Sequence, residues 1–394
     1  MANQAPPVAS AAFVRESCHR VLAAARAGRL ATLRLDESRL DAVVDAVIAT
    51  TRAAYPTLDI PFHARWRHFR VGGRDLWAEL DAATVWPTPR ARLAAAWDLA
   101  IVSVLLDAGA GMGWRYREPI TGQDSSKSEG LALASLAMFR DGAFSANPSD
   151  PLRVDAARLR ALSSHDLEAG FQVSAANPLV GLEGRAALLR RLATVADRPS
   201  DIAGPLLAAG GPVSGEAILG ALLDRLGPIW PKREGALPGA GDVWFHPEGL
   251  APRPGERPVV AFHKLSQWLA YSLIEPLQWI GIEVGGVDGL TGLPEYRNGG
   301  LLLDLGVLAL VDPADAARSH AVGSPLVIEW RALTVALLDV VGERVRARLG
   351  LSREALPLAK VLEGGTWATG RRIARERRAD GGPPLAVVSD GTVF

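Results

Sequence analysis

The chain has 394 residues, its 43 basic and 43 acidic side chains balance, and 48% of its residues are hydrophobic. This balance argues against a protein that coats nucleic acid, which normally carries a basic surplus. One cysteine, Cys18, excludes an internal disulfide and a cysteine-cluster metal site. The apolar segment LLLDLGVLALV is interrupted by Asp304 and is too short to cross a bilayer, so we expect a cytoplasmic protein without a membrane partner.

Helical periodicity dominates the chain after a flexible N-terminal tail at residues 1–10. In DESRLDAVVDAVIATTRAAY the apolar residues recur every three or four positions, which predicts one helix face, and Asp36 is the expected N-cap. Thr88 followed by Pro89 predicts the start of a helix within 87–107. Further helices are expected near 128–140, 182–196, 215–226, 262–280, 299–311, 324–349 and 356–378.

Strand signals are few. RWRHFRVGG (65–73) is typical of a hairpin arm, and LAVVSDGTVF (385–394) of a strand and turn. Residues 227–258 are rich in proline and glycine, as in a linker. Their aromatic residues favour instead a long ordered loop near a ligand-binding cleft. The pattern predicts a mainly α fold with a few short strands, in which residues 11–394 form a single compact helical domain.

Several common catalytic motifs are absent from the sequence. There is no phosphate-binding loop, and GAGMGW (109–114) has Trp114 where a dinucleotide fingerprint needs its third glycine. His63 and His68 are five residues apart, so they do not share a helix face as metal ligands do. No nucleophile elbow is present. We therefore expect neither a metal nor a cofactor.

The helix predicted at 262–280 carries an unusual polar face. Lys264, Gln267 and Tyr271 fall at i, i+3 and i+7, so they stack along one side of the helix. A solvated helix face is the plain alternative. A buried lysine needs an anion beside it, and either Glu295 or a substrate phosphate would supply one.

The segment DGLTGLPEYRNGG (288–300) sets strongly polar groups in a stiff bend between apolar segments. Asp288, Glu295, Tyr296 and Arg297 are either part of an ordinary loop with an Arg–Glu pair or part of a site. If a helix begins at residue 298 or 299, its first N–H groups would face whatever the loop binds.

A third polar segment is RYREPITGQDSSKSEGLALAS (115–135). Ser126-x-x-Glu129 has the spacing of a capping box, which is common and purely structural. Arg117, Ser126 and Lys127 lie just before the predicted helix, where hydroxyls and cations favour an anion such as phosphate.

The fourth segment is VLEGGTWATGRRIARERR (361–378). Glu363 and Trp367 precede a run of arginines on a predicted helix. We expect most of these arginines to extend into solvent, and one or two to reach the site.

Several long segments resemble a known family: YREPITG, SEGLALASLAMF, FHKLSQWLAYSLIEPL, DGLTGLPEYRNGGLLLDLGVL, EWRALTVALLD, LEGGTWATGRRIARERR and PPLAVVSDGTVF. Together they are similar to the uracil-catabolism family of bacteria and fungi, and within it to the fourth protein of the Urc pathway (the Urg family). The resemblance covers nearly the whole chain. It implies a place in a pathway that converts uracil, through a ring-opened ribosylurea, to urea and a three-carbon acid.

A fainter similarity connects FHKLSQWLAYSL and DGLTGLPEYRNGG with the queuosine-salvage N-glycosylases, which cleave a base from a ribose 5′-phosphate. It implies a helical, DNA-glycosylase-like core. The matching positions are Lys264, Gln267, Leu290, Thr291, Tyr296 and Arg297. Glu295 stands where that family has aspartate, which keeps a carboxylate one methylene further out, and Pro294 also departs from its pattern.

Both resemblances fit the hydrolysis of an N-glycoside, in which positive charge develops on the sugar and a fixed carboxylate stabilises it. We assign the role of that carboxylate to Glu295 or Asp288, and we expect Lys264 and Arg297 to position a phosphate. The expected enzyme is an N-ribosyl hydrolase that releases urea from a phosphorylated ribosylurea. The alternatives are an amidohydrolase or deaminase acting on the opened pyrimidine, and a non-catalytic binding partner in the pathway. Whether the chain forms a homo-oligomer is left open.

Overall fold

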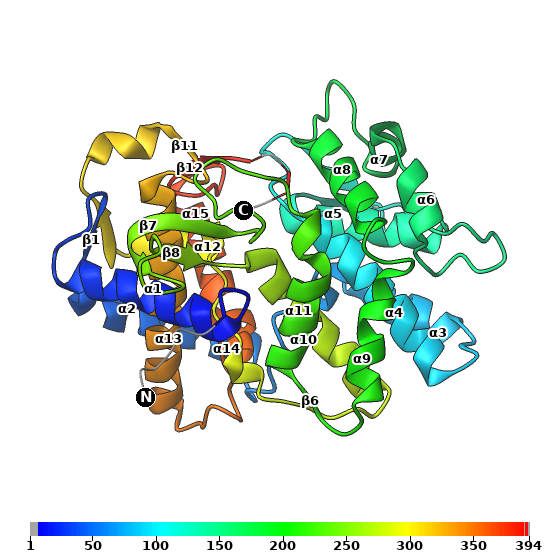
Figure 1. Cartoon of the computed structure of the whole chain (residues 1–394), viewed down its shortest axis with the longest axis horizontal. Helices are drawn as coiled ribbons and strands as arrows, with labels where there is room; N and C mark the ends of the chain where they lie inside the picture. The colour runs from blue at the N-terminus through cyan, green and yellow to red at the C-terminus, as the bar shows by residue number, and fades with distance from the viewer. Residues whose placement is uncertain (1–6, 390, 393–394) are drawn as a thin grey trace. The chain divides into compact units, whose positions relative to one another are not determined.

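The chain forms two compact units in the computed structural model, which describes residues 7–389, 391 and 392. Unit 1 comprises residues 7–63, Lys232–Gln267 and Gly286–Val388, and unit 2 comprises Ala64–Pro231, Trp268–Gly285 and the last described residues (Figure 1). The prediction of a mainly α chain is confirmed. The single domain and the DNA-glycosylase-like core stay predictions.

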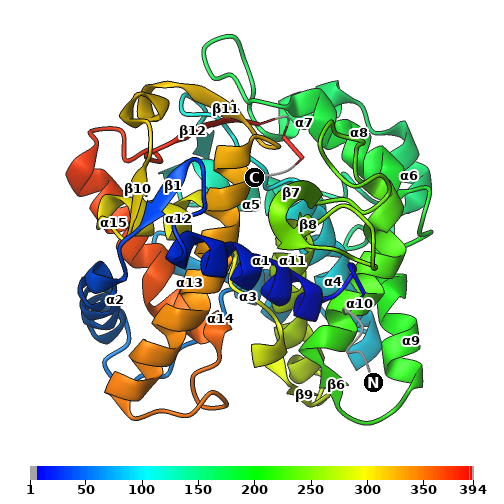
Figure 2. The ribbon, with the colours of Figure 1, turned by 60° about the vertical axis from the view of Figure 1, so that its left-hand side comes forward.

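Unit 1 is organised around one long helix, α13. Its helices are α1 (Ala11–Arg26), α2 (Leu40–Ala54), the start of α11 (Lys264–Trp279), α12 (Tyr296–Asp304), α13 (Pro325–Leu349), α14 (Leu358–Val361) and α15 (Trp367–Arg377). Short 3-10 turns lie at Glu37–Arg39, Val287–Gly289 and Pro313–Ala317, and a π-helical turn at Leu362–Thr366. Helix α13 packs against α1, α2, α12 and α14, and Figure 2 shows α1 crossing it. Because α13 is buried on nearly all sides, it forms the core of this unit.

The strands of unit 1 form three pairs. Strand β1 (Leu33–Leu35) pairs antiparallel with β10 (Leu308–Leu310), β7 (Val243–Leu250) pairs antiparallel with β8 (Val259–Ala261), and β11 (Ser319–Ala321) pairs parallel with β12 (Ala386–Val388).

Two sequence predictions need correction at these strands. The segment 227–258 is not a continuous loop, because its apolar residues form β7 against β8. A Cβ at Gly249 would lie 2.4 Å from the carbonyl oxygen of Val259, so this pairing requires glycine there. The helix predicted at 299–311 ends at Asp304, since Gly306 adopts a left-handed conformation (φ +76°) and β10 follows.

Unit 2 is built around two buried helices, α4 and α5. Its helices are α3 (Leu76–Ala83), α4 (Pro89–Leu105), α5 (Lys127–Arg140), α6 (Ala156–Ala161), α7 (Ser164–Gly170), α8 (Leu182–Leu192), α9 (Ala203–Ala208), α10 (Gly215–Leu226) and the remainder of α11. Its 3-10 turns are Arg65–Phe69, Pro199–Ile202 and Gly227–Ile229. Its strand pairs are β2 (Arg70–Val71) with β3 (Arg74–Asp75), β4 (Tyr116–Arg117) with β5 (Asp124–Ser125), and β6 (Val213–Ser214) with β9 (Val284–Gly285). The hairpin arm predicted at 65–73 therefore begins with a 3-10 turn.

The N-cap residues of the structure test the helix starts that were predicted from the sequence. Thr88 caps α4 with Pro89 in the first turn, as predicted, and Asp36 caps the 3-10 turn that leads into α2. The capping box at Ser126 is wrong, because Ser126 is the N-cap of α5 but its side chain makes no cap hydrogen bond. Lys127, the next residue, has a left-handed backbone (φ +54°), so the first turn is irregular.

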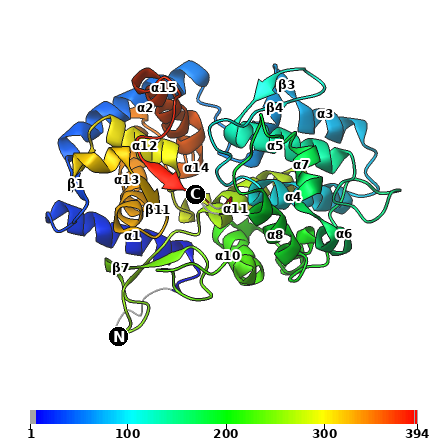
Figure 3. The ribbon, with the colours of Figure 1, turned by 90° about the horizontal axis from the view of Figure 1, so that it is seen from above.

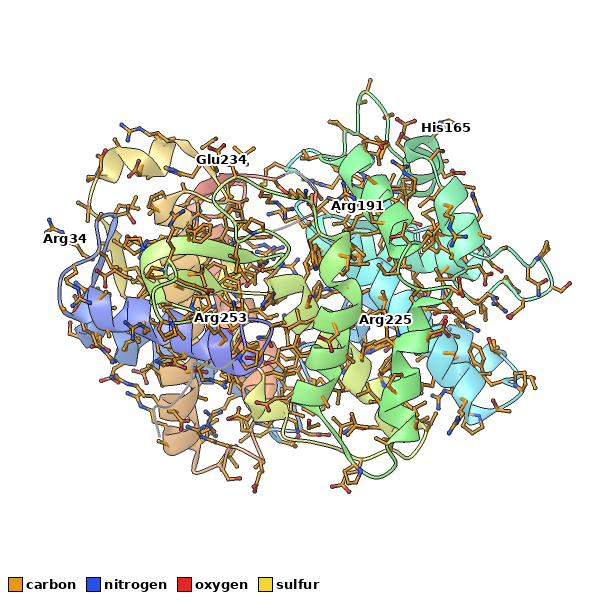
Figure 4. The ribbon with its side chains drawn as sticks, in the orientation of Figure 1. Arg34, His165, Arg191, Arg225, Glu234 and Arg253 are labelled. Carbon is orange, nitrogen blue, oxygen red and sulfur yellow. The ribbon has the colours of Figure 1, made fainter. Side chains whose placement is uncertain are left out.

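The described surface carries charges of both signs. Arg34 and Glu234 extend from unit 1, and Arg225 and His165 from unit 2, all four exposed (Figure 4). Within residues 7–389 and the two described residues beyond them, we find no helix that is both apolar and long enough to span a bilayer. Of the predicted N-terminal tail, residues 1–6 lie outside the described residues, and Ser10 caps α1.

Candidate functional site

A buried ion pair fixes the start of α11 in unit 1. The Asp242 carboxylate accepts two hydrogen bonds from the Arg331 guanidinium, at 2.8 and 2.6 Å, one from Trp244 Nε1 at 2.8 Å and one from the backbone N–H of Lys264 at 3.2 Å. Burial alone would raise the pKa of Asp242, but the charge and hydrogen bonds of Arg331 hold it well below its usual range. The carboxylate is thus ionised and holds the first N–H of α11.

The first turn of α11 lies against the segment 288–300. Gln267 is fully buried, and its Nε2 donates to Thr291 Oγ1 at 2.8 Å. The Thr291 N–H in turn faces Gln267 Oε1 at 3.4 Å. Lys264, one turn earlier, is 7% exposed. The structure therefore brings these two sequence segments together, and the hydrogen bonds between Gln267 and Thr291 connect them.

Glu295 is the N-cap of α12. Its carboxylate accepts hydrogen bonds from the backbone N–H of Arg297 at 3.1 Å and of Asn298 at 2.7 Å. One oxygen serves each N–H, so the carboxylate is held in place at the positive end of the helix. Glu295 is only half-buried, and each carboxylate oxygen can accept more than the one hydrogen bond that it receives here.

The glycines of PEYRNGG and of α15 allow close helix packing around Glu295. A Cβ at Gly299 would lie 2.7 Å from Thr334 Oγ1, so α12 packs directly on α13. A Cβ at Gly370 would lie 2.2 Å from the Arg297 carbonyl oxygen. Figure 3 shows α12 beside α15. The first turn of α12 is therefore packed closely against two other helices, α13 and α15.

Arg297 lies between aromatic rings. Its guanidinium carbon is 5.0 Å from the centroid of the Tyr296 ring and 5.2 Å from that of Trp367, and Arg297 is 6% exposed. Arg371 also lies over Trp367, at 5.4 Å. One arginine of the 371–378 run thus reaches this site through Trp367. Arg372, Arg375 and Arg377 are exposed, as predicted.

The π-helical turn before α15 presents a second carboxylate, Glu363. Its Oε2 lies 2.8 Å from Nδ1 of His63, and its Oε1 accepts from the Tyr55 hydroxyl at 3.3 Å. The His63 ring packs against Trp367, with centroids 6.0 Å apart. A chain of contacts thus runs from Glu363 through His63 and Trp367 to Arg297. From the sequence alone, His63 was considered only as a metal ligand and was excluded as one, so this pair was missed.

Asp288 has structural partners. Its carboxylate accepts the backbone N–H of Leu358 at 2.8 Å, at the start of α14, and lies 3.7 Å from Arg346 and 3.6 Å from Arg353. The guanidinium of Arg15 in α1 donates to the carbonyl oxygens of residues 288, 289 and 290 at 3.2, 3.1 and 2.8 Å, and to Asp339 at 3.0 Å. This Arg15 clamp fixes the beginning of the segment that ends at Glu295.

The remaining predicted site residues belong to unit 2. Arg117 is exposed and pairs with Asp124 at 3.4 Å, Ser126 and Lys127 lie at the irregular start of α5, and Tyr271 is fully buried in α11. Their assignment to substrate binding stays a prediction. Among the described residues, no three His, Cys, Asp or Glu side chains gather as a metal site.

Comparison with known proteins adds a family and two relatives. A family model described as "Protein of unknown function (DUF1688)" matches residues 8–394. The chain is 40% identical over 404 residues to protein urg3 of Schizosaccharomyces pombe, an alignment that covers 97% of this chain and 96% of the relative. It is 35% identical over 408 residues to uracil catabolism protein 4 of Lachancea kluyveri, which covers 92% of each.

Proposed function

The chain belongs to the DUF1688 family, and on that premise we propose that it is an enzyme of uracil breakdown that hydrolyses the N-glycosidic bond of a ribosylurea or its phosphate. The products would be urea and ribose or ribose phosphate. The pathway is supported by the name of one relative, uracil catabolism protein 4. The reaction is argued from the chemistry of the residues around Glu295.

The observation that carries the proposal is the fixed carboxylate of Glu295. Two backbone N–H groups hold it at the start of α12, and it stays half-buried there. Cleavage of an N-glycoside passes through a transition state with positive charge on the sugar. A carboxylate that is already oriented stabilises this charge without reorganisation. Asp288 is a weaker choice, because its oxygens serve Leu358 and two arginines.

The neighbouring residues would bind the rest of the substrate. Lys264 and Arg297 supply the positive charge that a phosphate needs, and remote phosphate binding holds the sugar in its reactive position. Tyr296 is half-buried, its ring lies under the guanidinium of Arg297, and it would contact a sugar hydroxyl or the urea group. Gln267 is already hydrogen-bonded to Thr291, so its role would be to position the segment rather than to touch the sugar.

A direct assay separates this proposal from its alternatives. The purified protein is incubated with ribosylurea and with ribosylurea 5-phosphate, and urea, ribose (phosphate) and ammonia are measured. Urea with ribose phosphate supports the N-ribosyl hydrolase. Ammonia points to a deaminase or amidohydrolase, and binding without turnover to a non-catalytic partner.

Glu295→Gln tests the assigned carboxylate. Glutamine keeps an oxygen that can cap α12 but removes the negative charge, so we expect turnover to fall about 100–1000-fold while the fold is retained. The control is Asp75→Asn, which removes the charge of another N-cap carboxylate, one that accepts the N–H of Ala78 at the start of α3 and pairs with Arg70. Wild-type turnover in Glu295→Gln would show that the carboxylate has been wrongly assigned.

A further inference from the structure

The proposed hydrolysis leaves one role unfilled, the activation of the attacking water. A second carboxylate, Glu363, lies in the same part of unit 1 as Glu295. Arg297, two residues after Glu295, lies over Trp367, and Trp367 packs against His63, which binds Glu363. Glycosidases commonly divide the two tasks, charge stabilisation and proton transfer, between two carboxylates.

Glu363 is held in a way that suits proton transfer. Each of its oxygens has one protein partner, Tyr55 on Oε1 and His63 on Oε2. Its side chain is 15% exposed while that of His63 is 4% exposed. The histidine therefore supports the carboxylate from the buried side, and the Glu363 side chain keeps part of its exposure. A base oriented by a second group in this manner is the usual arrangement in general acid–base catalysis.

The backbone at Glu363 is also unusual. Leu362–Thr366 is a π-helical turn between α14 and α15. Such turns are rare and frequently occur at functional sites. Here Gly365 allows α2 to approach, because a Cβ there would lie 2.5 Å from Val47 Cγ1 and 2.6 Å from Thr51 Oγ1. The π turn therefore fixes Glu363 against α2, and α2 ends beside Tyr55.

We propose that Glu363 is the catalytic base that takes a proton from the attacking water, with His63 and Tyr55 as positioning residues. This role rests on the proposed N-ribosyl hydrolysis. The water oxygen forms a bond to the anomeric carbon as one of its protons passes to Glu363. The electrons of the carbon–nitrogen bond leave with the urea nitrogen, which takes up a proton from solvent, and Glu363 then releases its own proton. The net change is the addition of one water.

The experiment measures urea release from ribosylurea 5-phosphate by the full-length chain and its variants, with thermal melting as the test of folding. Glu363→Gln should lower kcat on the order of 100–10,000-fold. In Glu363→Ala, added formate should restore part of the rate, because a free carboxylate then replaces the missing one. A merely structural role for Glu363 predicts no rescue by formate.

His63 provides the second test. His63→Asn can still donate a hydrogen bond to Glu363 and should keep more activity than His63→Ala. The matched control is His246→Asn, which alters another Glu–His pair of unit 1, formed with Glu329 at 3.5 Å. This control should keep its turnover within about twofold, since it lies outside the machinery assigned here.

The outcomes distinguish the two proposals. An active wild type with a slow, formate-rescued Glu363→Ala supports the role of Glu363. An active wild type with an equally active Glu363→Gln overturns that role and leaves the N-ribosyl hydrolase intact. A folded wild type that releases no urea overturns the proposed function and the role of Glu363 with it. If the Glu363 variants do not fold, equal rates in His63→Asn and His63→Ala overturn the positioning role.

Discussion

Asp242→Ala tests whether the start of α11 depends on the buried ion pair. The Asp242 side chain accepts four hydrogen bonds, two of them from the guanidinium of Arg331, which is 1% exposed. Removing the carboxylate takes the charge and the two hydrogen bonds of Asp242 away from the buried guanidinium of Arg331. Breaking a buried pair in this way typically costs about 3–5 kcal/mol, a large part of the roughly 5–15 kcal/mol that stabilises most domains.

The assay is unfolding in urea, followed by tryptophan fluorescence, at pH 7. Asp242→Ala should lower the free energy of unfolding by about 3–5 kcal/mol. The double variant Asp242→Ala/Arg331→Met should lose less than the sum of the two single variants, because it removes both members of the buried pair together. A loss below about 1 kcal/mol in Asp242→Ala would refute the reasoning, since Arg331 would then have found other partners at little cost.

The pH dependence of this difference has a defined sign. The pKa of Asp242 is depressed in the folded chain, and its unfolded value is about 3.9. Its contribution to stability is therefore fully present above about pH 4 and is lost as the pH falls below that value. The difference between wild type and Asp242→Ala should be constant from pH 7 to 5 and shrink in more acidic solution.

Two further predictions concern backbone packing and a helix cap. Gly370→Ala should destabilise the chain by about 1–3 kcal/mol, because the added Cβ meets the Arg297 carbonyl oxygen. The control is Gly220→Ala inside α10, where the added Cβ has open space around it and should stabilise the chain by about 0.5–1 kcal/mol. Equal melting temperatures of the two variants would contradict this prediction. Asp166→Ala should cost about 1 kcal/mol at pH 7. Because hydrogen bonds from the Ser163 N–H and hydroxyl lower the pKa of Asp166 to about 2, this cost should shrink as the pH falls from about 4 towards 2, and a pH-independent cost would contradict it.

The helices were the part of the fold that the sequence predicted best. The helix expected at 215–226 is α10, and that expected at 324–349 is α13, one residue shorter. Both have clear N-caps, Ser214 for α10 and Ser324 for α13. The apolar residues of α10 lie on one face, whereas α13 is a long apolar run that is buried on nearly all sides. The helix expected at 299–311 was too long, because its apolar run continues into a strand, and apolar character alone does not separate a helix from a buried strand.

The candidate site was predicted only where its residues are close in sequence. Glu295, Tyr296 and Arg297 stood out because they share one short polar segment, and the structure supplies the reason for its glycines in the packing of α12. The pairing of His63 with Glu363 joins residues 300 positions apart, and no local spacing predicts such a contact. Two adjacent glycines after Glu363 were the single local sign of an unusual backbone.

The Arg15 clamp has a practical consequence for shortening the protein. Three consecutive carbonyl oxygens ahead of Thr291 depend on one guanidinium from the first helix. A truncated chain that begins after α1 would keep every residue to which we assign a role in catalysis or substrate binding. It would still lose the Arg15 clamp, which holds the start of the segment that carries Glu295. Affinity tags and fusions are therefore best joined ahead of Ser10, and the first helix belongs to the minimal functional protein.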